Sequence, residues 1–454
     1  MSNYTGDSFK NLIVLAKNNN FIEPEYYDMY NVKKGLRNKN GTGVLVGLTK
    51  IGDVQGYDII NDKKVPKEGA LYYRGIEIKD FVKGFQDENR MGFEECIFLL
   101  LFGKLPSKSE LDEFNLLLDE LRFLPEGFTE NFLLKLPSKN IMNLLQRSVL
   151  FLYSMDDNPD DLSVENLVKQ SLELIAKIPT IMAYGYHATE HYFNGKSLFI
   201  HPPKRGLRTS ENILHMSRYN SKYTTTEAEV LDLCLVLHAE HGGGNNSAFA
   251  THVVSSSGTD TYSAISTAIG SLKGPKHGGA NSKVKLMMNN IKDNVKNYEN
   301  KTELKNYLLK ILSKNAFDGE GLIYGMGHAI YTLSDPRAVL LKEKAYKLAK
   351  EKNNIKEFQL YNDVESITKE IFKNSNGKLM TANVDLYSGF IYDMLNIPDN
   401  LYTPIFAAAR SAGWAAHRIE QILSDKKIIR PAYKHLLGNN IYSPLNQRSF
   451  KKEL

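Results

Sequence analysis

The sequence predicts a mainly α-helical protein with a small β meander near its N-terminus. Between residues 41 and 78, β-branched and aromatic residues alternate with turn-forming residues, as they do in short strands. After Ile78, apolar residues recur every three or four positions, which is the period of an amphipathic helix. The 454 residues exceed what one ordinary core holds. We therefore expect two or three domains, or one large helical body that carries a smaller one.

The predicted meander contains four short extended segments separated by turns. These are residues 44–46, 50–53, 57–60 and 71–73.

Ser107 and Glu110 have the spacing of a capping box and predict the start of a helix directly after Ser107. Its apolar residues repeat on one face: Leu111, Phe114, Leu117, Leu118 and Leu121.

Two later helices each lead to a histidine beside glycines. The helix after Thr226 carries apolar residues up to Leu237, and His241, four residues further, is predicted to continue that face and point inward. Gly242-Gly243-Gly244 then ends the helix. The next helix runs from about Tyr262 to Leu272 and ends at Gly274-Pro275, directly before His277.

Composition excludes several classes of protein. The net charge of 57 − 52 = +5 gives no reason to expect nucleic acid or an anionic membrane as partner. The longest apolar run, residues 96–102, is far shorter than the roughly 20 residues that span a bilayer. The N-terminal apolar run, residues 12–16, is too short for a secretory signal. Two cysteines in apolar helical patterns fit a reducing compartment, so we expect a cytoplasmic protein.

Three histidines are candidates for chemistry because glycines adjoin each of them. His241 precedes Gly242-Gly243-Gly244, His277 precedes Gly278-Gly279, and His328 follows Gly325-Met326-Gly327. Glycine lets the backbone adopt positive φ or lie against a ligand, although glycines also simply end helices. An imidazole paired with a carboxylate suits the deprotonation of a carbon acid. Asp385 supplies a carboxylate before an apolar segment, where its alternative role is that of a helix cap.

Three arginines are candidates for binding a small dianion. Arg337 lies nine residues after His328, Arg410 opens the helical segment 410–417, and Arg430 precedes Pro431. The guanidinium group binds carboxylates bidentately and keeps its charge, although most arginines form surface ion pairs.

Five stretches containing these residues resemble the citrate synthase family. They occur in the family's order and read LHAEHGGGNNS from Leu237, GPKHGGAN from Gly274, GMGHAIYTLSDPR from Gly325, NVDLYSG from Asn383 and ARSAGW from Ala409. A weaker likeness extends from about Val44 to Tyr433.

The resemblance implies a two-domain helical enzyme that closes on oxaloacetate and then binds acetyl-CoA. It implies a large domain from residues 1–278 and 390–454 and a small domain from residues 279–389. The implied activity is that of a citrate synthase, an acyltransferase that converts the acyl group to alkyl on transfer and begins the tricarboxylic acid cycle. The implied assembly is a homodimer, and no metal or cofactor is expected.

The resemblance also implies roles for individual residues. Asp385 is the base that takes a proton from the thioester methyl group, His277 holds the enolate oxygen, and His328 polarises the ketone. The oxaloacetate and citrate oxygens are held by His241, Arg337, Arg410 and, from the neighbouring subunit, Arg430. The adenine of CoA meets the segment Leu322, Ile323, Tyr324, Gly325, Met326 and Gly327.

The sequence departs from the family at two places. Residues 329–333 lack the basic residue that many members carry there to hold CoA phosphates, so Lys276, Lys283 and Lys285 are the substitutes. Gly242 stands where other members often have an acidic residue.

Three alternatives remain open on the sequence. The first is a 2-methylcitrate synthase that uses propionyl-CoA, because one methylene changes binding by only about 1 to 3 kcal/mol. The second is a metallohydrolase with His238 and His241 as ligands, although no third ligand accompanies them. The third is a non-catalytic CoA-binding protein, which the presence of Asp385 with His277 and His328 argues against.

Overall fold

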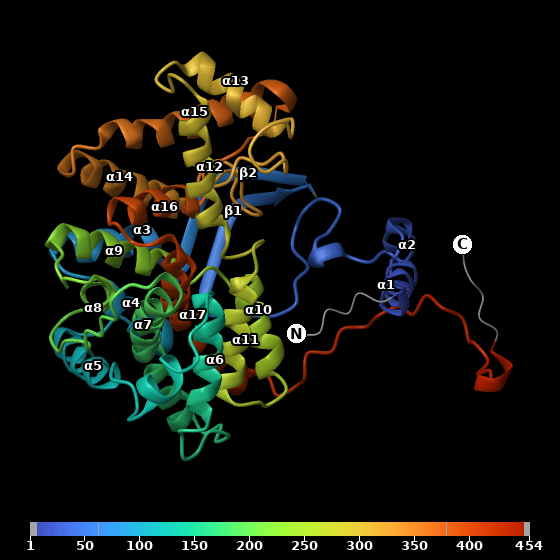
Figure 1. Cartoon of the computed structure of the whole chain (residues 1–454), viewed down its shortest axis with the longest axis horizontal. Helices are drawn as coiled ribbons and strands as arrows, with labels where there is room; N and C mark the ends of the chain where they lie inside the picture. The colour runs from blue at the N-terminus through green and yellow to red at the C-terminus, as the bar shows by residue number, and fades with distance from the viewer. Residues whose placement is uncertain (1–6, 62, 378, 449–454) are drawn as a thin grey trace. The chain divides into compact units, whose positions relative to one another are not determined.

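The computed structural model describes residues 7–61, 63–377 and 379–448, and most of its regular structure is helical (Figure 1). These residues form seventeen α-helices and a single three-stranded sheet. The prediction of a mainly α fold with a small N-terminal β meander is confirmed. The chain divides into two units, which are Gly47–Ile429 and the described parts of the terminal segments 1–46 and 430–454.

The terminal unit has little regular structure and no core of its own. It contains α1 (Asp7–Asn19), α2 (Pro24–Met29) and the short 3₁₀ turns Lys34–Leu36 and Leu445–Gln447. A cation–π contact joins its two segments, with Lys434 Nζ 5.3 Å from the centre of the Tyr30 ring. No side chain whose exposure is described in this unit is buried. Several of its apolar side chains are fully open, among them Tyr433 and Ile441 at 94% and 96% exposure.

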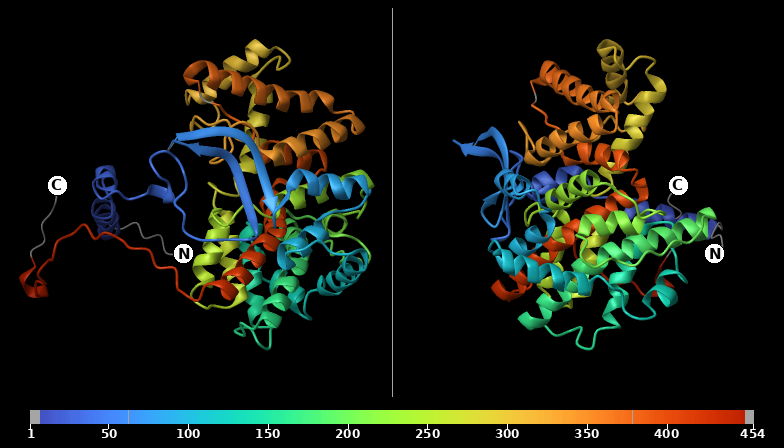
Figure 2. Two further views of the ribbon diagram at one scale, coloured as in Figure 1. Left: turned by 180° about the vertical axis from the view of Figure 1, so that it is seen from behind. Right: turned by 90° about the vertical axis from the view of Figure 1, so that its left-hand side faces the viewer.

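The sheet begins the main unit. Strands β1 (Gly52–Ile60), β2 (Lys63–Tyr73) and β3 (Ile76–Glu77) are antiparallel, Gly52 pairs with Tyr73, and a bulge interrupts β1. Figure 2 shows the β1–β2 hairpin against the helices. The prediction of a strand at residues 44–46 is wrong, because no neighbouring strand pairs with that segment and Leu45 is exposed.

Ten helices form the larger part of the main unit. They are α3 (Ile78–Asp87), α4 (Phe93–Phe102), α5 (Lys108–Leu121), α6 (Ile141–Tyr153), α7 (Val164–Asn194), α8 (Thr209–Ser217), α9 (Thr225–His238), α10 (Asn246–Ser255), α11 (Thr261–Lys273) and α17 (Tyr402–Ser424). A five-residue π-helical turn, Thr129–Leu133, and a 3₁₀ turn, Asp399–Leu401, connect some of them. The predicted capping box is present at the start of α5, since Glu110 N donates to Ser107 Oγ and Ser107 N donates to Glu110 Oε2.

Five further helices follow α11 and pack on one another. They are α12 (Ala280–Asn294), α13 (Lys301–Leu312), α14 (Pro336–Glu351), α15 (Ile355–Asn376) and α16 (Val384–Met394). In Figure 1 they lie together in the upper part of the main unit.

Helix α17 is the central helix of the main unit. Its residues from Pro404 to Ile419 are buried almost without interruption, because α4, α7, α9, α10 and α11 all pack against it. The helix is rich in alanine and contains Gly413, which lets neighbouring backbones approach closely. A Cβ on Gly413, for example, would collide with the carbonyl oxygen of Ala239. This helix therefore places Arg410, Trp414 and His417 beside the loop that carries His241.

None of the described helices combines the length and the apolar character needed to cross a membrane.

Candidate active site

The loop after α9 carries His241. Helix α9 ends at His238, so the prediction that the helix continues to His241 is wrong, although the imidazole is buried as predicted. Gly242 has φ of +80°, a conformation that allows the chain to turn away directly after His241. Glu240 fixes the loop, because its carboxylate accepts hydrogen bonds from Gly242 N and His417 Nε2. Buried His241 Nε2 has no hydrogen-bond partner among the described residues.

A tight turn after α11 carries His277. Its glycines are required by close packing rather than by positive φ, because neither Gly278 nor Gly279 adopts it. A Cβ on Gly279 would lie 2.9 Å from Pro275 Cα, and one on Gly278 would collide with the carbonyl oxygen of Leu272. The turn folds on itself and leaves the imidazole of His277 half-buried.

The imidazole of His277 contacts a serine of helix α10. Its Nε2 lies 3.0 Å from Ser247 Oγ at the start of α10. Ser247 Oγ also accepts a hydrogen bond of 3.0 Å from Trp414 Nε1 and donates its own proton to Asn245 Oδ1 at 2.9 Å. Burial, followed by the charge of Arg410, lowers the pKa of His277 to about 4. His277 is therefore a neutral imidazole at physiological pH.

The loop before α14 carries His328. Gly325 and Gly327 have φ of +80° and +91°, which favour glycine. The ring of His328 stacks on Tyr331, with 4.6 Å between centroids. Its Nδ1 accepts hydrogen bonds from Ile330 N and Tyr331 N at 3.1 and 3.2 Å. Since Nδ1 is an acceptor, the proton of the neutral ring lies on Nε2.

Asn383 joins the His328 loop to the helix that carries Asp385. Its Nδ2 donates to the carbonyl oxygen of Gly327 at 2.9 Å, and its Oδ1 accepts from Asp385 N at 3.0 Å. Asn383 is thus the N-cap of α16, and the interpretation of Asp385 as the cap is wrong. The Asp385 carboxylate has no hydrogen-bond donor among the described residues and is left for other contacts.

The environment of Asp385 makes its carboxylate a stronger base than usual. Burial raises the pKa of Asp385 to about 6, the nearby charges of Arg337 and Arg410 oppose this rise, and Asp335 adds to it. A base with this pKa is ionised at neutral pH yet still able to take up a proton.

Arg337 lies at the first turn of α14 and is buried. Its Nε and Nη2 donate to the two carboxylate oxygens of Asp335 at 3.0 and 2.7 Å. This bidentate ion pair holds the pKa of Arg337 above its usual value, despite the opposing effect of burial.

Arg410 lies in the interior of α17 rather than at a helix start, so its predicted position is corrected. Its Nε donates to the carbonyl oxygen of His238 at 2.5 Å, and its buried Nη1 has no hydrogen-bond partner among the described residues. Burial lowers the pKa of Arg410 to about 10, which leaves it charged at neutral pH.

Six of the predicted site residues lie close together: His241, His277, His328, Arg337, Asp385 and Arg410. The ring centroids of His241 and His328 are 5.1 Å apart. Burial lowers the pKa of His241 well below its usual value, and the positive charges of Arg337 and Arg410 act in the same direction. Asp385 interacts electrostatically with both arginines. The cluster therefore combines neutral imidazoles, one basic carboxylate and two buried cations, a set of groups that suits an anionic substrate.

Arg430 belongs to the terminal unit. Its side chain is exposed and has no ion pair with a described residue.

The predicted CoA segment, residues 322–327, is partly open. Leu322 is exposed, Ile323 is buried, and Tyr324 donates its hydroxyl proton to Asp318 Oδ2 at 2.7 Å. Of the three candidate lysines, Lys283 pairs with Asp318 and Lys285 with Asp393. Lys276 is exposed and has no ion pair with a described residue.

Four supporting residues were not predicted from the sequence: Ser247, Asn383, Glu240 and Tyr331. Each lies within a few residues of a predicted histidine or of Asp385, or inside a quoted motif. Their position in or near these motifs could have indicated them. Their roles were not predicted, because their hydrogen bonds join segments that are remote in the chain.

His238 has a different environment from that expected of a metal ligand. Both of its ring nitrogens are buried without hydrogen-bond partners, and the ring packs 4.3 Å from that of Phe406. Among the described residues, neither His238 nor His241 belongs to a group of three metal-ligating side chains.

Comparison with known proteins identifies the family of the chain. The family described as "Citrate synthase, C-terminal domain" matches residues 39–432. The citrate synthase of Synechocystis sp. is 32% identical over 92% of this chain and 94% of its own. The 2-methylcitrate synthase 1 of Corynebacterium glutamicum is 29% identical over 92% of this chain and 99% of its own.

A solved structure extends the likeness to three dimensions. The crystal structure of citrate synthase from Thermotoga maritima superposes with a TM-score of 0.69 at 31% identity, covering 90% of this chain and 99% of that one. The fold and the site thus define a helical condensing enzyme of the citrate synthase type. The chain belongs to the citrate synthase family.

Proposed function

We propose that this chain is a citrate synthase that condenses acetyl-CoA with oxaloacetate and hydrolyses the resulting citryl-CoA. Acetyl-CoA, oxaloacetate and water give citrate, CoA and a proton. In enzyme class it is an acyltransferase that converts the acyl group to alkyl on transfer. The observation that carries the proposal is the basic Asp385 carboxylate, with a pKa of about 6, among two buried arginines and neutral histidines.

Oxaloacetate binds first, at the cationic part of the cluster. Buried Arg410 Nη1 and His241 Nε2, which have no hydrogen-bond partner among the described residues, supply hydrogen bonds to substrate oxygens. Arg337, already oriented by Asp335, adds a second positive charge. Two fixed guanidinium groups suit a dicarboxylate because each presents its donors in a rigid fork.

Proton transfer from the acetyl methyl group starts the reaction. Asp385 removes the proton, and the negative charge moves to the thioester oxygen, where His277 Nδ1–H donates a hydrogen bond. In this role the Ser247 hydroxyl turns away from Asn245 Oδ1, to which it donates in this structure, and gives its proton to His277 Nε2, which leaves the ring proton on Nδ1. A preorganised donor of this kind stabilises the transition state by roughly 3 to 4 kcal/mol.

Carbon–carbon bond formation follows at the ketone of oxaloacetate. The enolate carbon attacks the carbonyl carbon, and the ketone oxygen receives a proton from His328 Nε2. The backbone donors on His328 Nδ1 suit this role, since they leave Nε2 as the protonated nitrogen. Water then attacks the thioester carbon of citryl-CoA and gives one proton back to His328, and the carbon–sulfur bond breaks. The departing thiolate takes the proton held by Asp385 and leaves as CoA, and the new carboxyl group of citrate releases its proton to solvent.

The proposed domains move relative to each other during this cycle. The large domain consists of residues 1–278 and 390–454 and the small domain of residues 279–389, so that His328, Arg337 and Asp385 lie on the small domain. Closure excludes water until condensation has occurred. The segment Leu322–Gly327 receives the CoA adenine, and Lys276, beside His277, is the candidate for a CoA phosphate. The proposed chemistry uses no metal and no other cofactor.

The proposed assembly is a homodimer in which Arg430 completes the neighbouring site. Exposed Arg430 and the open apolar side chains of the terminal unit, such as Tyr433 and Ile441, support a role for this segment on another subunit. We further propose that the enzyme acts in the cytoplasm and supplies the first step of the tricarboxylic acid cycle.

A 2-methylcitrate synthase is the second candidate, because a relative of that name matches 92% of the chain, the same share as the citrate synthase of Synechocystis sp.. The two activities differ by one methylene on the acyl group, which a pocket discriminates by only about 1 to 3 kcal/mol.

Thiol release tests the proposal and separates the two candidates. Acetyl-CoA and propionyl-CoA are each supplied with and without oxaloacetate, and with and without a chelator. We expect oxaloacetate-dependent release, faster with acetyl-CoA and unchanged by the chelator. Release faster with propionyl-CoA would favour the second candidate, and release from neither would refute both.

A further inference from the structure

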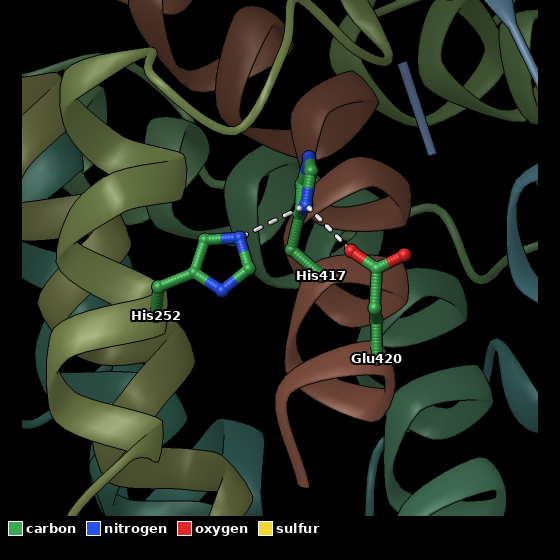
Figure 3. Close-up of side chains that lie close together, drawn as sticks. All are labelled: His252, His417 and Glu420. Atoms are coloured by element: carbon green, nitrogen blue, oxygen red, sulfur yellow. Dashed lines mark hydrogen bonds and ion pairs between the residues drawn. The ribbon is translucent and has the colours of Figure 1, made fainter. Parts of the chain in front are cut away.

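A group of metal-ligating side chains lies outside the predicted catalytic residues, between α10 and the last turns of α17. Figure 3 shows His252 from α10 facing His417 and Glu420 from α17. His252 Nε2 lies 3.1 Å from His417 Nδ1, and His417 Nδ1 lies 3.9 Å from Glu420 Oε1. The three atoms all lie within 4.8 Å of one another. We call these three side chains the His–His–Glu cluster.

Outer hydrogen bonds determine where each imidazole carries its proton. His417 Nε2 lies 3.0 Å from the carboxylate oxygen Oε1 of Glu240, an atom that only accepts, so the proton of His417 lies on Nε2. His252 Nδ1 lies 2.8 Å from Gln421 Oε1, while the amide nitrogen of Gln421 points to the carbonyl oxygen of Asp425. The proton of His252 therefore lies on Nδ1. The two nitrogens that face each other both present lone pairs.

The third atom of the cluster is also an acceptor. Glu420 Oε1 is buried and has no hydrogen-bond donor among the described residues, whereas Oε2 accepts from Lys50 N at 2.7 Å. Three electron-pair donors thus converge on one point, and such an arrangement is unfavourable unless a cation, either a proton or a metal ion, lies between them.

We propose that the His–His–Glu cluster binds a divalent transition-metal ion of the zinc class. Two tetrahedral zinc ligands at 2.0 to 2.1 Å are about 3.3 Å apart, close to the separation of the facing nitrogens. Glu420 Oε1, at 3.9 Å from His417 Nδ1, reaches the ion by a small side-chain rotation. Imidazole ligands favour zinc, nickel or copper over magnesium or calcium, which prefer oxygen. Glu240 and Gln421 act as the outer partners that orient metal-binding histidines.

The position of the cluster gives the ion a structural role. A Cβ on Gly243 would lie 3.4 Å from His252 Nε2 and 3.5 Å from His417 Cε1, so the His241 loop runs directly over the cluster. Glu240 links His417 to Gly242 N at the other side of that loop. A bound ion would therefore tie α10, α17 and the His241 loop together without taking part in the reaction.

Metal titration of the full-length chain without an affinity tag tests this proposal. After treatment with a chelator, Zn²⁺ is titrated against a chromophoric competitor. We expect one tight site per chain, and we expect His252→Gln and Glu420→Gln each to weaken it by at least about tenfold. X-ray absorption spectroscopy at the zinc edge of the loaded protein is expected to show two imidazole nitrogens and one oxygen at about 2.0 to 2.2 Å from the ion.

The matched control is His201→Gln. His201 lies near His187 and His215 in a second histidine-rich region, so this variant detects zinc bound there instead. Circular dichroism verifies that each variant is folded. Two results would overturn the proposal. One is the absence of zinc binding to the wild-type chain, and the other is binding that His201→Gln removes and His252→Gln does not. Either would leave a shared proton as the explanation of the contact between His252 and His417.

Discussion

Ser247 Oγ lies 3.0 Å from His277 Nε2 and, on its other side, 3.0 Å from Trp414 Nε1. The serine therefore orients the imidazole, and in the proposed mechanism it also keeps the ring proton on Nδ1. We predict that Ser247→Ala lowers kcat by about 10- to 100-fold, the effect of losing a hydrogen bond worth about 1 to 3 kcal/mol, and changes the KM for oxaloacetate little. Steady-state kinetics checks this.

The control for Ser247→Ala is Ser271→Ala, because the Ser271 hydroxyl bonds Asn246 near the same turn but is exposed. Equal losses in both variants would point to a general disturbance of the turn and not to His277.

The pH dependence of activity reports on Asp385. Because its pKa is raised to about 6 and the base must be ionised, kcat/KM is predicted to fall as pH decreases through about 6. His277, with a pKa of about 4, stays neutral throughout this range and adds no second step. A pH profile from 5 to 8 checks this, and a flat profile down to about pH 5 would contradict the basic carboxylate.

The helical part of the fold was predictable because helix signals are local. The capping box at Ser107 and Glu110 and the apolar period up to Leu272 depend on neighbours a few residues away. Strand prediction failed at residues 44–46, since a strand exists only where a second segment pairs with it. The end of α9 was also misplaced, because His241 is buried by tertiary packing and not by helical position.

The candidate site was predictable where glycines mark a histidine. Gly242, Gly325 and Gly327 adopt the positive φ that the sequence suggested, whereas Gly278 and Gly279 are needed for close packing. The roles of Ser247 and Asn383 were not predictable, because each acts by a hydrogen bond to a residue at least 30 positions away.

Arg410→Lys tests the binding of oxaloacetate. Lysine keeps the charge but loses the planar fork, so we predict a KM for oxaloacetate about 10- to 100-fold higher, corresponding to roughly 1.5 to 3 kcal/mol. Arg418→Lys is the matched control, because Arg418 is a buried arginine of the same helix that bonds Ser255, Thr259 and Thr261 instead. Similar KM values in the two variants would argue against a substrate contact for Arg410.

Mixing two inactive variants tests whether Arg430 acts in the neighbouring subunit. Arg430→Ala and Asp385→Asn are each predicted to be nearly inactive. After subunit exchange, half of the dimers contain one chain of each variant. One of the two sites in such a dimer is intact, so about a quarter of the wild-type activity is expected. Thiol release measured before and after exchange checks this. No recovery, with exchange verified by mass spectrometry, would place Arg430 in its own subunit's site or outside it.

The most direct test of the proposed mechanism is the rate of oxaloacetate-dependent thiol release by Asp385→Asn. The substitution keeps the shape of the side chain and removes the base, so we predict a fall in kcat of about 10² to 10⁴ while oxaloacetate still binds. Asp393→Asn, on the same helix but paired with Lys285, is predicted to retain wild-type turnover. Turnover by Asp385→Asn equal to that of the wild-type enzyme would contradict the assignment of Asp385 as the base.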